Sequence, residues 1–298
     1  MPADDLPTPQ GDRPFPALEH LRWASRPRLH RPVLIVAFEG WNDAGDAATT
    51  AVNSLGDAWD ADTFAEIDPE IFYDFTTTRP HVRIDDDGTR AIDWPENLIS
   101  AATVNETLDV ITLVGTEPQL RWRTFCTQIT GLAQLYDVRL VITVGALLAE
   151  VPHTRPTPVY GAAFNDDVTQ ELGLMPSRYE GPTGIVGVLH AACADAGLHS
   201  ASLWAAVPTY VPSAPSPKAA LSLVERTLRM LDIEIDTEEL LAEATAYEEQ
   251  ISELVDADEE SRDYVRQLEA AYDENEGLIG EGGTLIEEVE RYLRDHRD

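Results

Sequence analysis

The chain has 298 residues, of which 43% are hydrophobic, and a formal net charge of 33 negative at pH 7. This length accommodates one large α/β core with an appendage, or two modest domains. The charge repels nucleic-acid phosphates and anionic lipid surfaces, so we expect neither nucleic acid nor a membrane as a partner. No run approaches the roughly 18 unbroken apolar residues of a membrane helix, and the polar, proline-rich start is unlike a signal peptide, so we expect a cytoplasmic protein.

Common signatures of metal and cofactor sites are missing from the sequence. Cys126 and Cys193 stand in neither a CxxC pair nor a Cys/His ligand spacing, which gives no support to a disulfide framework or a zinc site. There is also no GxGxxG after a strand, no GxxxxGK[ST], no GxSxG and no HExxH. We therefore expect no metal and no cofactor, and the sequence assigns no catalytic residue.

The first part of the chain predicts an arm followed by buried strands. Residues 1–31 hold six prolines and no sustained periodicity, which predicts a loosely ordered arm whose Leu18, Leu21 and Trp23 pack on the core. Nearly continuous apolar runs then occur at 33–38, 110–114, 138–144 and 201–207. Such runs are typical of parallel strands that are covered on both faces, so we place them at the centre of one sheet.

Helical patterns separate these runs. Asp43 can cap a helix over 44–55, a second helix is predicted over 119–136, and a third over 182–196 with Pro182 in its first turn. Between the first helix and residue 113, alternating segments at 63–67, 71–75 and 81–85 predict short strands and a hairpin. The fold class is therefore α/β, a doubly wound, mostly parallel sheet with an antiparallel excursion at its edge.

The last quarter of the chain is strongly acidic. From Asp232 to Asp298 there are 24 acidic and 5 basic residues. A 4-3 apolar spacing between Tyr247 and Tyr272 fails at Asp258 and Ser261, which predicts two helices joined near residue 257. Glycines at 277–283 then link these helices to a last helix from Thr284 to about Arg294.

These patterns divide the chain into four parts. They are an N-terminal arm (1–31), an α/β core (32–232), an acidic helical hairpin (233–276), and a glycine linker with a tail helix (277–298). The tail helix carries an apolar stripe too small to fold alone, so we expect it to bind a partner or a neighbouring subunit. The candidate partner-binding residues are Leu285, Ile286, Val289 and Leu293.

Polar side chains collect where the predicted strands end. Because ligand sites in parallel sheets lie outside the carboxyl ends of the strands, these residues form a candidate cleft. Its members are Glu39, Trp41, Asn42, Asp43, Glu117, Arg121, Trp122, His153, Arg155, Tyr179, Thr183 and Lys218.

Two interpretations of this cleft stay open. In one, Glu39, Glu117 or His153 acts as an acid or base while arginines and the amides of residues 181–184 hold an anion. In the other, the carboxylates cap helices, the arginines pair with them, and the tryptophans close the end of the core. Lys218 follows Pro217 at a helix start, an unfavourable place for a cation, so a paired carboxylate or a bound anion would explain it.

Several ordered motifs resemble a known family. Phe38-Glu-Gly-Trp-Asn-Asp-Ala-Gly-Asp-Ala47 is followed by Pro118-x-x-Arg-Trp122, Val151-Pro-His-Thr-Arg-Pro156, Tyr179-Glu-Gly-Pro-Thr-Gly-Ile-Val-Gly187 and Pro217-Lys-Ala219. Together they resemble the bacterial branch of the proteasome assembly chaperone family, second-subunit type.

The resemblance implies a core similar to that of nucleoside phosphorylases and peptidyl hydrolases, and homo-oligomers, among which we favour a trimer. It also implies protein partners that include proteasome subunits. Relatives that dock on proteasome rings end in hydrophobic-Tyr-any residue, whereas this sequence ends Asp295-His-Arg-Asp298. The leading hypothesis is an oligomeric protein-binding chaperone or scaffold, more a binding protein than an enzyme. The alternatives are a hydrolase or transferase, or a binder of anionic small molecules, that uses the cleft.

Overall fold

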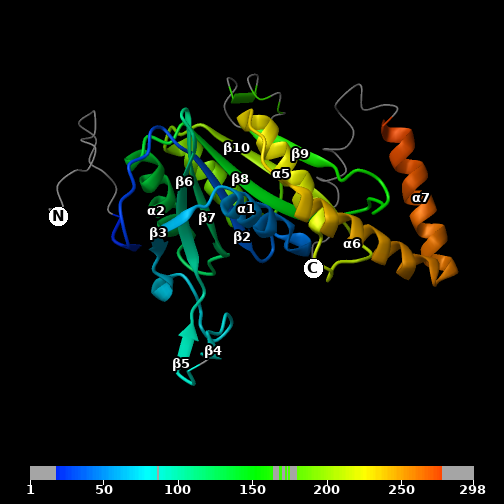
Figure 1. Ribbon diagram of the computed structural model, residues 1–298, viewed down its shortest axis with the longest axis horizontal. Coiled ribbons are helices and arrows are strands. Elements are labelled where there is room, and N and C mark those ends of the chain that lie inside the picture. Colours follow the sequence, from blue (N-terminus) through cyan, green and yellow to red (C-terminus); the bar gives the residue numbers. More distant parts are fainter. Residues whose placement is uncertain are drawn as a thin grey trace.

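A mixed sheet forms the centre of the protein (Figure 1). The computed structural model describes residues 18–276, with the exception of residues 86, 164–167, 170–171, 173 and 175–179. Within this part, one sheet has the strand order β1-β3-β6-β7-β2-β8-β10-β9. Its four central strands run parallel, as the continuous apolar runs predicted: β7 (Leu108–Thr116), β2 (Val33–Glu39), β8 (Leu140–Ala149) and β10 (Ser200–Pro208).

Antiparallel strands extend both edges of the sheet. Beyond β7 lie β6 (Asn97–Asn105), β3 (Asp62–Ile67) and β1 (Leu21–Trp23), and β9 (Val159–Ala163) lies beyond β10. The antiparallel excursion is confirmed, but β1, β6 and β9 were not predicted, and β1 lies in the segment expected to be a loosely ordered arm. The strand predicted at 71–75 is wrong. That segment follows a 3₁₀ turn, η2 (Pro69–Ile71), and buries two consecutive side chains, Phe72 and Tyr73, where a strand would send them to opposite faces.

The predicted hairpin forms a second, separate sheet. Within the described part of the chain, strands β4 (His81–Ile84) and β5 (Arg90–Asp93) pair only with each other. In Figure 1 this hairpin projects away from the body of the protein.

Helices cover both faces of the main sheet. On one face lie α1 (Ala47–Ala58) and α5 (Pro217–Leu231), and on the other lie α2 (Trp122–Leu135) and α4 (Ile185–Asp195). Alternate residues of β2 divide between the two layers: Val33, Ile35 and Ala37 join one apolar cluster, and Leu34, Val36 and Phe38 join the other. Both faces of the strand are therefore buried, which explains its unbroken apolar sequence and confirms the doubly wound architecture.

The boundary of one helix differs from the prediction. Helix α4 begins at Ile185, so Pro182 precedes the helix rather than lying in its first turn. The predicted end is close to the observed one: α4 ends at Asp195, and Gly197 adopts a positive φ of 70° just beyond it.

Two long helices follow the core. Helix α6 (Glu238–Asp256) lies against α5, and its Leu240 and Ala244 belong to the same apolar cluster as α1 and α5. Helix α7 (Glu259–Glu276) begins after a short break, as predicted near residue 257. Leu254 fits the predicted 4-3 apolar spacing between Tyr247 and Tyr272, but its side chain is 66% exposed and does not join a buried face. No helix in the described part of the chain is long and apolar enough to cross a membrane.

Candidate functional site

The N-terminus of α4 is capped by side chains from the ends of two strands. Gly184, the residue before the helix, has no side chain to satisfy the first free N–H groups. Instead, Ile185 N–H donates to Glu117 Oε1 at 2.8 Å, and Val186 N–H donates to Asn42 Oδ1 at 3.3 Å. The Glu117 carboxylate also lies at the positive end of the helix dipole. The place that an anionic ligand would take is therefore filled by the chain's own carboxylate.

Asn42 is fixed in a confined space at this junction. It is only 2% exposed, and its backbone carbonyl accepts a 2.8 Å hydrogen bond from Ala146 N–H, which connects it to β8. A Cβ atom at Gly184 would lie 2.3 Å from both the Oδ1 and the Nδ2 atoms of Asn42. Glycine is therefore needed at position 184 because the backbone there lies so close to the Asn42 side chain. Through Asn42, the loop after β2 is hydrogen-bonded to both β8 and the start of α4.

Asp43 serves the start of α1, as its position predicted. Its Oδ1 accepts hydrogen bonds from Ala48 N–H at 2.6 Å and Thr49 N–H at 3.3 Å, and its Oδ2 accepts from Thr49 Oγ1. The helix itself begins at Ala47, after a short 3₁₀ turn, η1 (Ala44–Asp46). Burial outweighs these hydrogen bonds and raises the pKa of the Asp43 carboxyl to about 6.

The other residues expected near this junction lie at or near its surface. Glu39 is exposed and accepts a 3.2 Å hydrogen bond from Thr116 Oγ1. Trp122 is the first residue of α2, and its indole N–H donates to the carbonyl of Pro118, four residues earlier. Three more predicted cleft residues are exposed: Trp41, Arg121 and Thr183. Tyr179 lies outside the described residues.

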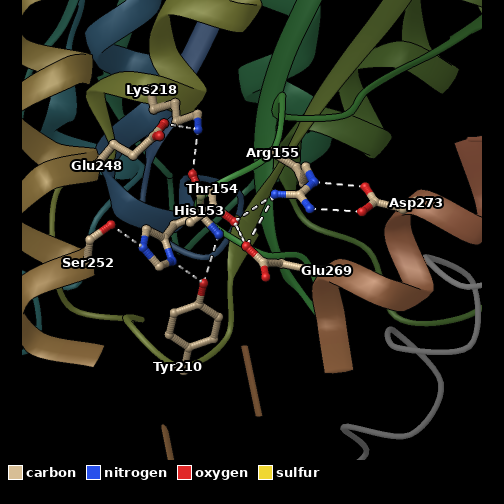
Figure 2. Close-up of polar contacts among 9 residues, drawn as sticks. All are labelled: His153, Thr154, Arg155, Tyr210, Lys218, Glu248, Ser252, Glu269 and Asp273. Carbon is tan, nitrogen blue, oxygen red and sulfur yellow. Dashed lines mark hydrogen bonds and ion pairs between the residues drawn. The ribbon is translucent and has the colours of Figure 1, made fainter. Parts of the chain in front are cut away.

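His153 stands in a second cluster, between the core and α6 (Figure 2). It is 3% exposed. Its backbone N–H donates to Tyr210 Oη at 2.8 Å, its Nδ1 lies 2.7 Å from the same Oη, and its Nε2 lies 3.0 Å from Ser252 Oγ. Burial lowers the pKa of the imidazole, and the neighbouring Lys218 lowers it further. His153 is thus a neutral ring at pH 7 with both nitrogens in contact with hydroxyl groups.

Lys218 and Arg155 extend this cluster towards the acidic helices. Lys218 Nζ donates to the His153 carbonyl and pairs with Glu248 of α6, so the paired carboxylate that its position called for is present. Arg155 forms two parallel 2.8 Å hydrogen bonds with Asp273 of α7, and its Nη1 lies 3.2 Å from Glu269 Oε1. Pairing with Asp273 raises the pKa of the Arg155 guanidinium and lowers that of the Asp273 carboxyl.

We call this second cluster the helix latch. It consists of His153, Thr154, Arg155, Tyr210, Lys218, Glu248, Ser252, Glu269 and Asp273. In Figure 2 the loop after β8 lies between α6 and α7 and contacts both. The latch joins His153, Thr154 and Arg155 to acidic helices 99–118 residues later in the sequence. It joins Lys218 to Glu248, 30 residues later. Local sequence patterns give no signal for which residues form these pairs.

The predicted cleft residues therefore divide between two structural assemblies. Asn42, Asp43 and Glu117 hold helix N-termini, while His153, Arg155 and Lys218 hold α6 and α7. Among the described residues, no group of three or more His, Cys, Asp or Glu side chains lies in an arrangement that could hold a metal ion. These contacts support the structural interpretation of the strand-end polar residues.

A doubly wound α/β core with an appended helical pair defines the class of protein. The chain belongs to the PAC2 family, whose family model matches residues 37–255. This confirms the resemblance carried by the sequence motifs. No curated protein matches the chain significantly.

Solved structures support the same assignment. A PAC2 family protein from Streptomyces avermitilis is 44% identical, with a TM-score of 0.73, and the match covers 78% of this chain and 99% of that one. A proteasome-assembly chaperone homologue from Mycobacterium tuberculosis is 45% identical, with a TM-score of 0.71 and the same coverage. PbaB of Pyrococcus furiosus, described as an archaeal proteasome activator, is 18% identical, with a TM-score of 0.64. The match covers 78% of this chain and 97% of that one, and at this identity it shows a similar fold alone.

Proposed function

We propose that this protein is a protein-binding chaperone of the proteasome-assembly type. The observation that carries the proposal is membership of the PAC2 family together with 45% identity to a proteasome-assembly chaperone homologue over nearly the whole of that chain. Its partners would be proteasome subunits, which it would meet in the cytoplasm. We further propose that it works as a homo-oligomer, with a trimer favoured.

The contacts at the sheet edge favour binding over catalysis. A catalytic acid or base needs a proton or lone pair of its own that is free to reach the reacting atom of a substrate. Both ring nitrogens of His153 already contact hydroxyl groups, and Glu117 already accepts a helix N–H. These side chains already serve structural contacts, so the enzyme hypothesis receives less support than the chaperone hypothesis.

Capture of partners from a native lysate tests the proposal. The tagged full-length chain is used as bait at physiological salt, and captured proteins are identified by mass spectrometry. Because a net charge of 33 negative attracts basic proteins without specificity, the matched control is an unrelated tagged protein of similar size and charge. Enrichment of proteasome subunits over that control is the expected result.

A purified system provides the decisive measurement. Purified proteasome ring subunits are mixed with the full chain, and ring formation is followed by light scattering. Faster ring formation, or a complex between the chain and an unassembled subunit, is expected. Emergence of the protein as a homo-oligomer without a partner, in both the lysate and the purified mixture, would contradict the proposed function.

A further inference from the structure

The β4–β5 hairpin presents an apolar face to solvent. Val82 and Ile92 are paired across the two strands and are 60% and 55% exposed, and the neighbouring Ile84 is 63% exposed. Because side chains alternate along a strand, these three lie on the same side of the hairpin. Trp94, just beyond β5, continues the alternation and is 45% exposed. We call Val82, Ile84, Ile92 and Trp94 the hairpin face.

This face has the properties of a binding surface. A two-stranded hairpin is marginally stable in water by itself, and β4 and β5 have no hydrogen-bonded neighbour in the main sheet of the described chain. Contiguous exposed apolar groups on a soluble protein mark places where another segment binds. Arg90 lies directly opposite Ile84, and no described acidic residue forms an ion pair with it. The occupant should therefore combine an apolar stripe with a negative charge.

Residues 277–298 of the sequence have this chemistry. Leu285, Ile286, Val289 and Leu293, the predicted partner-binding residues, lie outside the described part of the chain. On a helix of 3.6 residues per turn they form one stripe, and the same spacing places Glu288 and Glu290 at its two margins. An apolar stripe with acidic margins complements an apolar face with a cation at one end.

The length of the linker decides which copy of the chain supplies the tail. Seven residues, 277–283, separate the end of α7 from the predicted helix, and they span at most about 25 Å when extended. A compact chain of 298 residues has a radius of gyration of about 19 Å and is therefore about 50 Å across. Figure 1 shows the hairpin and the C-terminal end of α7 on opposite sides of the protein. The tail can therefore reach the hairpin of a neighbouring copy more readily than its own.

We propose that the hairpin face binds residues 284–294 of a second copy of this chain. The contact is heterologous, because a tail on one copy meets a hairpin on the next. A closed ring satisfies every tail and every hairpin at once, whereas an open chain leaves one of each unpaired at its ends. The proposal concerns contact between copies, so it holds or fails independently of the identity of any other partner.

Cysteine cross-linking between two differently tagged full-length chains tests this contact. One chain carries Ile92→Cys and the other carries Val289→Cys. The native Cys126 and Cys193 are both buried, so they should not compete with the introduced thiols. The matched control replaces Ile92→Cys by Leu254→Cys, which places a thiol at an apolar position on α6 that is 66% exposed, against 55% for Ile92.

A disulfide between the two tagged chains, well above the Leu254→Cys control, is the expected result. Adding Ile84→Asp to the Ile92→Cys chain should abolish this product, while adding Leu254→Asp should leave it unchanged. If the cross-link forms no more than in the control, the hairpin does not bind the tail, and the proposal is wrong. If a single chain that carries both Ile92→Cys and Val289→Cys gives only an intrachain disulfide, the tail binds its own copy, which also overturns the proposal.

Discussion

Replacing Gly184 by alanine is expected to destabilise the protein through one steric conflict. The backbone at Gly184 is extended, with φ −92° and ψ −172°, so alanine can adopt it without conformational strain. The added Cβ, however, would lie 2.3 Å from the amide atoms of Asn42, which is buried and cannot turn towards solvent. The amide must therefore move and release the Val186 N–H.

The size of the effect follows from two contributions. A buried N–H left without its acceptor costs about 1–3 kcal/mol, and forcing an extra carbon into a packed site costs about 1–3 kcal/mol. Gly184→Ala should therefore lower the free energy of unfolding by roughly 2–6 kcal/mol. Gly56→Ala, within helix α1, is the matched control. Its added Cβ would lie 3.8 Å from Thr112 Oγ1, an ordinary van der Waals contact. It should stabilise the protein by about 0.4–1 kcal/mol.

Urea unfolding followed by circular dichroism measures both effects, with the midpoint compared at constant slope. The double variant with Asn42→Ala isolates the cause, because removal of the amide leaves the new Cβ without a clash. In that background the cost of Gly184→Ala should largely disappear. An unchanged midpoint for Gly184→Ala alone, or an undiminished cost in the Asn42→Ala background, would show that the Asn42 contact does not hold α4.

The remaining predictions concern charge and the tail. Burial favours the protonated form of Asp43. The free energy of unfolding of the wild type, relative to that of Asp43→Asn, should therefore fall by about 3 kcal/mol as pH rises from about 4 to about 6, and stay constant above pH 6. Urea unfolding of both proteins across this range measures the difference, and a difference that does not change with pH would refute the prediction. Arg155→Gln removes the pairs with Glu269 and Asp273 and should raise hydrogen exchange in α7 but not in the central sheet. Equal exchange in wild type and variant would show that the latch does not hold α7. Removal of residues 277–298 should preserve the circular dichroism of the core while lowering oligomer mass or partner binding, and full mass with every native partner would make the tail a solubilising appendage.

The centre of the fold was predictable because its signal is local. A strand buried on both faces needs an unbroken apolar sequence, and residues 33–38 and 201–207 could be assigned on that basis alone. The edges lack this property. Strand β9 is five residues long and contains a glycine, and it is a strand because it pairs with β10. The segment around Phe72 and Tyr73 has strand-like composition, but the packing of both rings into the core overrides it.

The position of the candidate residues was predictable, and their partners were not. Polar side chains after β2 and β7 could be placed at one edge of the sheet, because parallel strands end together there. Whether that edge is an open cleft depends on contacts across long stretches of sequence. Arg155 meets Asp273 from 118 residues away, and Glu117 meets Ile185 from 68 residues away.

The sequence by itself therefore determined the parallel core, the break between the acidic helices and the family, because each depends on the order and spacing of nearby residues. The tertiary structure decided that the strand-end residues cap α4 and secure α6 and α7, and that an apolar hairpin face stays exposed. Those outcomes depend on which distant groups meet when the chain folds. A hydrogen bond or an ion pair forms wherever the fold brings a donor close to an acceptor. The residues next to either group in the sequence do not indicate which distant partner it will have.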